Sequence, residues 1–455
     1  LALLADDRGA NLATLGAILL FGMTVTELRH TPAPPTGTPG EYEIVVRERL
    51  SEREGKTASG TTIRARRNSA TGEWLPAAGN LVVRCDSSTV LNPGDRAVVR
   101  GKIYPFTARH GGYGRLMTRR GYVGTLYLNR SSLLLRDTLH RELPPKHLSL
   151  FLHERAVARL DRLSLAPDEQ ALCNAMTAGD RRSLSPALRA AYSRSGTSHL
   201  LAVSGLHVGI VFLLANLLLW WLPLFRHGHI LRNIAVILLI WLYAATTGFP
   251  PSVVRAALMF SVLQFALASS SEYVGMNTLA GVAFVMLLFH PDYLFDISFQ
   301  LSFIAVAGII AWGLPLCRLL RTRRKSIDML TATLAIGFSA SAATAPLISH
   351  TFGQISVVGL ALNPVVILLS YVVVGSCTLW LVIPGTVLAP LFSDVAGFAA
   401  RAQNELIRAA AALPAAALDI RLTTTQCWIV YGLFIFATLL LWSAERKKSV
   451  SSLPE

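Results

Sequence analysis

The second half of the chain alternates long apolar runs with short polar loops. The runs 208–222 and 234–248 contain no Asp, Glu, Lys or Arg, and each is long enough for one crossing of a bilayer's hydrocarbon core. The pattern therefore predicts a polytopic α-helical membrane protein. The predicted spans lie near 199–222, 231–248, 254–271, 274–290, 297–316, 329–349, 355–370, 372–390 and 427–443.

A further apolar run, 11–28, brings the expected total to about 9–10 transmembrane helices. This run has no small-residue cleavage site, so residues 1–30 are expected to form a membrane anchor, with a cleaved signal peptide as the alternative. Residues 31–40 contain four prolines and two glycines. Because proline fixes φ and removes a backbone donor, this stretch is predicted to be a linker without helix or strand.

Residues 41–140 have a different pattern, with short runs that alternate or are rich in β-branched side chains. Asn92, Pro93, Gly94 and Asp95 form a strong turn signal, since proline presets φ and glycine accepts positive φ. Five short strands in one small domain predict a β-barrel, closed or partly closed, of the OB-like kind. The predicted strands are 42–49, 61–67, 81–85, 96–103 and 122–128.

Composition and charge predict the orientation of the chain. A sequence with 52% hydrophobic and 15% charged residues is not that of an ordinary soluble protein, although its formal charge is +15. Basic residues gather in the loops 226–232 and 318–325 and in the tail 446–455. If 355–390 crosses the membrane twice, all three lie on one side, which is expected to be cytoplasmic. The β-domain is then extracytoplasmic.

Two helical segments are predicted outside the spans. Residues 141–198 have apolar positions at helical spacing, which predicts amphipathic helices connecting the β-domain to a channel domain at 199–445. The segment 396–413 is rich in alanine but carries charged residues, so it is predicted to be an amphipathic helix on the outer surface.

The β-domain carries an excess of positive charge, with 17 Lys and Arg against 9 Asp and Glu between 41 and 140, a net of +8. Cations attract phosphates and aromatic rings such as Tyr127 stack on bases, so this composition is typical of a surface for single-stranded nucleic acid. A solubilising basic domain, or attraction to anionic lipid headgroups, is the alternative. The candidate DNA-binding residues are Arg64, Arg66, Arg67, Arg100, Lys102 and Tyr104.

Polar residues inside apolar spans are costly, which makes them candidate pathway residues. His199, Ser204 and His207 open the first span after the connector, and they form one polar stripe if this segment is helical. Three interpretations remain open: a Ser/His nucleophile pair of an intramembrane hydrolase, small polar residues for close helix packing, or the lining of a hydrated pathway. No acidic orienter or metal motif accompanies them, so no catalytic residue, metal or cofactor is predicted.

Three other places in the spans carry polar side chains. Arg255 lies one turn into an apolar run, where it either snorkels to the interface or offers a cation to a polyanion or to Asp296. Asp296 and Gln300 share a helix face and line a pathway, or else they provide a helix cap and an interhelical hydrogen bond. Gln354 and Asn363 belong to a region interrupted by proline and glycine, and a cavity is expected nearby.

These polar blocks resemble the competence domain of the ComEC family. The resemblance covers roughly 170–370, and its blocks occur in the expected order. It implies a channel for single-stranded DNA that crosses the bacterial inner (cytoplasmic) membrane many times. It also implies an external DNA receptor and a cytoplasmic ATP-driven translocase as partners, and it leaves a homo-oligomer open. The blocks are AGDRRSLS at 178–185, SGTSHLLAVSGLHVG at 195–209, then 247–260, 296–308, and 352–354 with Asn363.

One departure from the family is expected. Many members end in a metallo-β-lactamase-like domain whose clustered His and Asp residues bind metal. Nothing similar to its H-x-H-x-D-H motif follows Trp442 in this sequence. The chain is therefore expected to lack that domain, and if the nuclease is needed, a separate protein is expected to supply it.

The expected function is a channel, not an enzyme, that moves single-stranded DNA into the cytoplasm during natural transformation, surrounded by membrane lipids. A secondary transporter for a small solute is the main alternative, which explains intramembrane Asp and His residues but not a basic β-domain. An intramembrane hydrolase is the third hypothesis, and it predicts that a serine-reactive probe labels Ser204.

Overall fold

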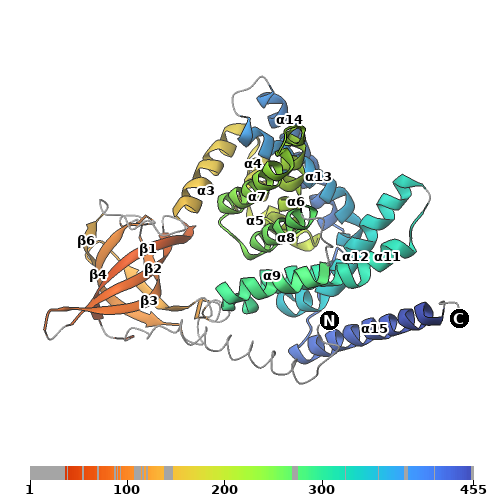
Figure 1. Cartoon of the computed structure of the whole chain (residues 1–455). Coiled ribbons are helices and arrows are strands. Elements are labelled where there is room, and N and C mark those ends of the chain that lie inside the picture. Colours follow the sequence, from red (N-terminus) through yellow and green to blue (C-terminus); the bar gives the residue numbers. More distant parts are fainter. Residues whose placement is uncertain are drawn as a thin grey trace. The chain divides into compact units, whose positions relative to one another are not determined.

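The computed structural model (Figure 1) describes residues 36–451 apart from short stretches. The chain divides into a barrel unit, Leu1–Leu148 with Leu287–Phe295, and a helical unit, Ser149–Met286 with Asp296–Glu455. The predicted anchor 1–30 and most of the predicted linker lie outside the described residues. The stretches that are not described are 1–35, 38, 54–55, 69–70, 87–88, 90, 93, 107–113, 115–116, 119–120, 138–146, 269–274, 323, 357, 384–387, 414–415 and 452–455.

Five strands of the barrel unit form a closed ring, as the sequence predicts. β1 pairs with β2 and β4, β3 pairs with β2, and β5 pairs with β3 in parallel and with β4 in antiparallel orientation. A sixth strand, β6, pairs with β4 outside the ring. It is not among the predicted strands, because its sequence LLLRD neither alternates nor contains a β-branched residue. The strands are β1 (Pro39–Arg53), β2 (Lys56–Arg67), β3 (Trp74–Cys85), β4 (Arg96–Pro105), β5 (Tyr122–Leu128) and β6 (Leu133–Asp137).

The barrel closes around side chains that alternate inward along each strand. On β1, Tyr42, Ile44 and Val46 are buried, while Glu41 and Glu43 lie on the opposite face. The other strands complete the core with Ile63, Leu81, Val83, Val99, Ile103 and Leu126, all nearly inaccessible to solvent. Burial of this apolar surface drives closure.

Two local predictions for the barrel have different outcomes. The predicted turn is confirmed: Asp95 N donates to Asn92 O at 3.0 Å, and Gly94 has a φ of +91° that glycine adopts without strain. The linker prediction is wrong for its last two residues. Pro39 and Gly40 begin β1 opposite Lys102 and Gly101 of β4, a position that proline tolerates as the first residue of a strand.

The helical unit contains thirteen α-helices in the described part of the chain, counting α3, whose first residues precede Ser149. A π-helical segment at Ile309–Gly313 joins α10 to α11. The helices are α3 (His147–Leu160), α4 (Pro167–Thr177), α5 (Pro186–Arg194), α6 (Gly205–Leu218), α7 (Gly228–Thr246), α8 (Pro251–Ala268), α9 (Gly275–Phe289), α10 (Ile297–Gly308), α11 (Leu314–Leu319), α12 (Lys325–Phe352), α13 (Val358–Val382), α14 (Ala389–Ala411) and α15 (Thr424–Ser451).

Five helical segments in the described residues are long and apolar enough to cross a membrane. They are Gly205–Leu224, Gly228–Thr246, Ile297–Leu319, Ile327–Phe352 and Ala361–Val382. Three shorter apolar helices, Pro251–Ala266, Gly275–Phe289 and Thr424–Thr438, accompany them. Their outward faces carry large apolar side chains, among them Leu217, Phe265, Leu368 and Trp428, as a lipid-facing bundle requires. The chain is a multi-pass membrane protein.

The prediction that 355–370 and 372–390 form two spans is wrong, because one continuous helix, α13, runs from Val358 to Val382. Pro364 lies within this helix and Pro346 lies within α12, so neither proline interrupts a span. The chain then returns along α14, which packs on α13. Strand β7 (Ile355–Ser356), before α13, pairs with β8 (Ala417–Leu418), after α14, so both ends of this hairpin lie together. The side of the membrane on which the basic segments lie stays a prediction.

Polar contacts lock α14 onto α4 and α5. Asn404 and Gln403 are buried on α14, and both contact the hydroxyl group of Tyr192: that group donates to Asn404 Oδ1 at 3.0 Å and accepts from Gln403 Nε2 at 3.2 Å. Asn404 Nδ2 also donates to the carbonyl of Asp168 at 3.2 Å. Because buried polar groups without partners are costly, these contacts fix which face of the amphipathic helix is turned inward.

Glu41 holds three strands of the barrel together and gives its stability a pH dependence. Its carboxylate accepts from Arg100 on β4 and from Arg67 on β2, with closest contacts of 2.5 and 3.0 Å. The hydrogen bonds from Arg100, followed by that from Arg67, hold the pKa of Glu41 below its ordinary value of 4.5. The stabilisation is therefore fully present above pH 4.5 and is lost as the pH falls through the lower folded-state pKa.

We expect the substitution Glu41→Gln to speed hydrogen exchange in β1 and β4 near neutral pH, because both arginines lose their anion. Exchange measured by mass spectrometry on the whole protein, corrected for the intrinsic rate, is expected to become equal in variant and wild type below the folded-state pKa. Glu43→Gln, which breaks a pair with Arg96 alone, serves as the control and is expected to have a smaller effect. Equal exchange in Glu41→Gln and wild type near neutral pH contradicts the assignment.

Candidate functional site

Four exposed side chains form a row across three neighbouring strands of the barrel, which we call the cation–aromatic row: Arg84, Tyr127, Tyr104 and Lys102. Arg84 on β3 is directly opposite Tyr127 on β5, and its Cζ lies 6.0 Å from the centre of that ring. The rings of Tyr127 and Tyr104 meet edge to face at 5.8 Å, and Lys102 Nζ lies 5.7 Å from the Tyr104 ring centre. The two tyrosines are 54% and 47% exposed, so their faces are open to a ligand.

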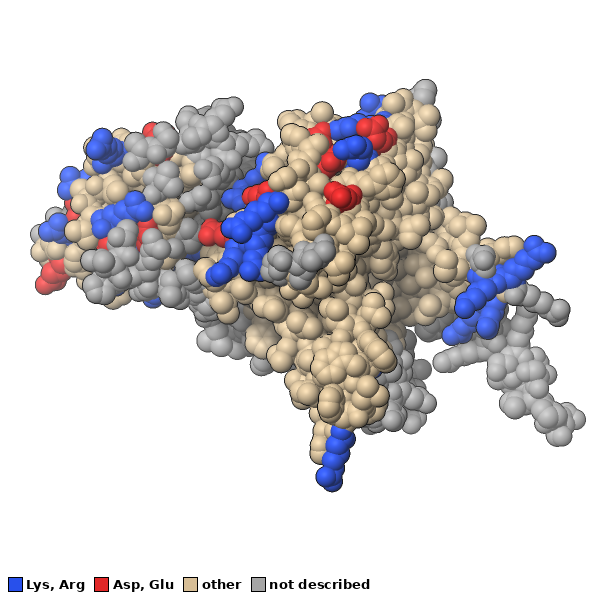
Figure 2. All heavy atoms as spheres, turned by 90° about the horizontal axis from the view of Figure 1, so that it is seen from above, with Lys and Arg blue, Asp and Glu red and all other residues tan. Residues whose placement is uncertain are grey.

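The structure separates the predicted DNA-binding residues into groups. Lys102 and Tyr104 belong to the cation–aromatic row, whereas Arg67 and Arg100 have their charges balanced by Glu41. Arg64 is exposed on β2, and the neighbouring Arg66 is half-buried. Figure 2 shows accordingly that charges of both signs share the surface of the barrel unit.

Arg84 is not among the DNA-binding residues predicted from the sequence. It is the one residue of 81–85 that is exposed, so its charge at the outward position of an otherwise buried strand was the available signal. Its pairing with Tyr127 depends on the register of β3 and β5, which a local pattern does not reveal. The row therefore combines the predicted Lys102 and Tyr104 and the ring of Tyr127, already noted in the sequence, with Arg84, which the structure adds.

The predicted polar stripe of the first span is not a stripe. His199 lies in a short 3₁₀ turn, Ser198–Leu201, and α6 begins only at Gly205, so His199 and His207 are not two turns apart on one helix. His199 is exposed, whereas His207 is fully buried. Ser204 precedes α6, and its backbone N–H donates to His207 Nδ1 at 2.9 Å, as in a capping box.

This geometry disfavours the nucleophile pair. The Oγ atom of Ser204 lies 3.2 Å from His207 Nδ1, but that nitrogen already accepts the backbone N–H of Ser204. A general base needs a free lone pair on the nitrogen that faces the hydroxyl group. The other ring nitrogen, Nε2, is buried and has no partner among the described residues. Ser204 and His207 thus form the N-terminal cap of α6.

Arg255 faces the protein interior and does not snorkel. It is 7% exposed on α8; its Nη1 donates to the Met259 sulfur at 3.5 Å, and its Cζ lies 5.8 Å from the centre of the Phe303 ring. No carboxylate of the described residues forms an ion pair with it, and its Nε has no hydrogen-bond partner there. The expected partner Asp296 instead caps α10, accepting from Ser298 N at 2.8 Å and Phe299 N at 3.3 Å. The capping alternative for Asp296 is therefore confirmed.

The remaining predicted pathway residues lie on or beside α10, α12 and α13. Gln300 lies on the first turn of α10, and its N–H donates to the carbonyl of Asp296 at 3.0 Å. Gln354 follows α12 and donates to Ser193 Oγ at 2.7 Å, which ties this loop to α5. Asn363 precedes Pro364 within α13, and its Oδ1 is buried without a described partner.

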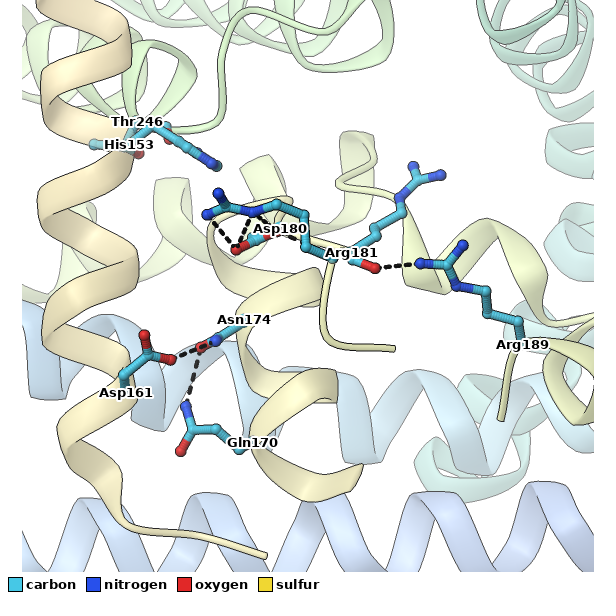
Figure 3. Close-up of polar contacts among 9 residues, drawn as sticks. His153, Asp161, Gln170, Asn174, Asp180, Arg181, Arg189 and Thr246 are labelled. Carbon is cyan, nitrogen blue, oxygen red and sulfur yellow. Dashed lines mark hydrogen bonds and ion pairs between the residues drawn. The ribbon is translucent and has the colours of Figure 1, made fainter. Parts of the chain in front are cut away.

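The block 178–185 builds the connection between α4 and α5 (Figure 3). Asp180 accepts from Arg182 through both carboxylate oxygens, at 2.9 to 3.1 Å, and Arg189 donates to the carbonyl of Arg181. Burial raises the pKa of Asp180, but the hydrogen bonds from Arg182 outweigh it, so the pKa lies below its ordinary value. Gly179 has a φ of +84°, which allows the sharp turn out of α4. This block is a structural joint of the helical unit.

Comparison with known protein families gives a match that lies mainly in the helical unit. A family model described as "Competence protein" matches residues 176–447. ComE operon protein 3 of Bacillus subtilis (strain 168) is 31% identical over 223 residues, which are 48% of this chain and 27% of that protein. A protein of Aquifex aeolicus (strain VF5) with the name "Uncharacterized protein" is 29% identical over 201 residues, 44% of this chain and 45% of that protein. The matches span less than half of each relative, and no solved structure matches significantly.

The capping geometry predicts that Ser204 is chemically inert. A fluorophosphonate probe applied to membranes that contain the protein is expected to leave it unlabelled, because His207 Nδ1 is occupied by a backbone N–H. A serine hydrolase in the same membranes serves as the positive control. Labelling that disappears in Ser204→Ala contradicts this account and revives the hydrolase hypothesis.

Proposed function

Because this chain belongs to the ComEC family of competence proteins, we propose that it forms a channel in the inner (cytoplasmic) membrane. The channel passes single-stranded DNA into the cytoplasm during natural transformation and performs no chemistry on it. An external receptor delivers the DNA, and an ATP-driven translocase on the cytoplasmic side pulls the strand inward. Family membership carries the role in competence; the nature of the strand and its passage are the proposal.

The observation that supports this proposal best is the cation–aromatic row. A single strand exposes both its phosphates and the faces of its bases, and the row offers Arg84 and Lys102 to the former and two tyrosine rings to the latter. Stacking and ionic contacts do not depend on base identity, so such a surface accepts any sequence. A transporter for a small solute has no use for a row that crosses three strands.

The helical unit supports the proposal through its spans and its few intramembrane polar groups. Most of these groups pair with one another or cap helices, as described above. His207 Nε2 has no partner among the described residues, but Nδ1 of the same ring is engaged in the cap of α6. The other predicted pathway residues that are exposed, or that have buried polar atoms without partners in the described part of the chain, are His199, Arg255 and Asn363. We assign these three to the strand's path, and Ser204, His207, Asp296, Gln300 and Gln354 to the packing of the bundle around it.

Deletion of this gene in its native host tests the proposed function. Labelled DNA is followed into a pool that is protected from external nuclease and then into the cytoplasm. We expect DNA to accumulate outside the inner membrane and none to enter. Unchanged entry of DNA into the cytoplasm contradicts the proposal and favours transport of a small solute.

The cation–aromatic row predicts how binding of DNA responds to substitution. In nanodiscs of uncharged lipid, the whole protein is expected to lose about tenfold in affinity for fluorescent oligo(dT) with either Tyr104→Ala or Tyr127→Ala, since base–aromatic stacking contributes about 1–3 kcal/mol. Trp74→Ala removes an exposed ring outside the row and serves as the control. Equal losses in all three variants contradict a specific role for the row.

The cations of the row are expected to act through phosphate. Arg84→Gln and Lys102→Gln each remove one ionic contact, so the slope of log affinity against log salt concentration should become shallower by about 0.7 for each variant. The same titration on Arg67→Gln, whose charge is balanced by Glu41, should change the slope less. A slope that no variant alters rules out contact between the row and the phosphate backbone.

A further inference from the structure

The N-termini of two helices meet around the Arg255 side chain. Ser252 on the first turn of α8 donates from its Oγ to the carbonyl of Val203, just before α6, at 2.9 Å. A Cβ atom added to Gly205, the first residue of α6, would lie 3.0 Å from Arg255 Nη2. The guanidinium group on α8 therefore lies close to the first residue of α6, and a side chain at position 205 would press against it.

The electrostatics of this arrangement are unbalanced. The first N–H groups of a helix lack intrahelical acceptors, and the helix dipole makes this end positive. Here α6, with 14 residues, and α8, with 18, both begin beside a buried cation. A carboxylate would be expected at such a point, yet the guanidinium meets only a thioether sulfur and the face of an aromatic ring among the described residues. Both are weak acceptors.

We infer that Arg255 and the N-terminus of α6 form a binding site for an oxyanion of the phosphate class. The planar guanidinium group presents Nε, which has no partner among the described residues, beside Nη2 as a fork that matches two oxygens of a phosphate. The first two N–H groups of α6 supply further donors, whereas those of His207 and Val208 already bond to the Ser204 carbonyl. Arg255 is more than nine-tenths buried. An anion here is therefore held by donors that the fold already positions and with which water does not compete.

The natural ligand is a phosphodiester group of the passing strand. This identification rests on the proposed function, whereas the anion site itself does not. A site that has one cation and no carboxylate suits the passage of a DNA strand, because conduction requires a site that attracts the ligand and still releases it. The phosphate of an anionic lipid is the other source of the same chemistry, and the experiment separates the two.

The test measures the thermal unfolding midpoint of the full chain in maltoside detergent, freed of phospholipid, in a phosphate-free buffer of constant ionic strength set with gluconate. Inorganic phosphate, oligo(dT) and phosphatidylglycerol are added separately. A ligand that binds the folded state raises the midpoint with its concentration. We expect phosphate and oligo(dT) to raise it, and Arg255→Met to need about tenfold more phosphate for the same shift.

The control is Arg401→Met, which removes an arginine that is already paired with Glu169 and is expected to keep the full shift. A shift of wild-type size in Arg255→Met, or no shift of the wild type with any of the three additions, overturns the site. A shift with phosphatidylglycerol but not with oligo(dT) supports the anion site and overturns its assignment to DNA.

Two further variants keep the test decisive if Arg255→Met does not fold. Arg255→Lys retains the charge but loses the fork, and Gly205→Ala crowds the guanidinium group. Both are expected to weaken the response to phosphate, and wild-type responses in both overturn the site. DNA uptake is scored separately in cells, so a protein that imports DNA without a phosphate response refutes the site and leaves the proposed function standing.

Discussion

Polar groups that leave water for the interior of an apolar helical bundle must find their partners within the protein. The polar residues of the helical unit differ in how they meet this constraint. Ser204 and His207 meet it by beginning α6, and Asp296 meets it by capping α10. Tyr192 and its amide partners meet it by locking α14 onto α4 and α5. Arg255 differs from these residues because it is a buried cation that forms no ion pair among the described residues, and its Nε has no partner there. This unbalanced charge is what calls for a ligand.

The barrel satisfies the opposite requirement, because its outer surface keeps charge exposed. Part of that charge stabilises the fold, because the carboxylate of Glu41 joins three strands through ion pairs with Arg67 and Arg100. Among the described residues, neither Arg84 nor Lys102 takes part in an ion pair, so the positive charge of the cation–aromatic row stays available for phosphate. In the proposed channel the barrel therefore holds the strand by many weak, sequence-independent contacts, and the bundle offers a single preorganised one.

Local patterns were enough to predict the barrel and most helices, because strand alternation, the turn at 92–95 and the apolar runs each depend on neighbouring residues. Predictions failed where the structure or the partners of a residue depend on a distant part of the chain. Pro364 looked like a break, but α13 continues through it and α14 provides the return. The cation–aromatic row depends on the register between β3 and β5, and the roles of Asp296 and Arg255 depend on which groups the fold brings to each. Their opposite charges within apolar spans suggested that these last two could pair, but no ion pair joins them in the structure.

The most direct test of the account is reconstitution of the purified chain in vesicles that enclose a single-strand-binding protein as a trap. Fluorescent single-stranded DNA, duplex DNA and a small anionic solute are added outside, and their entry is measured after external nuclease treatment. The account predicts that single-stranded DNA enters only vesicles containing the protein, that duplex DNA stays outside, and that Arg255→Met slows entry. Entry of the small solute without entry of the strand would contradict the account.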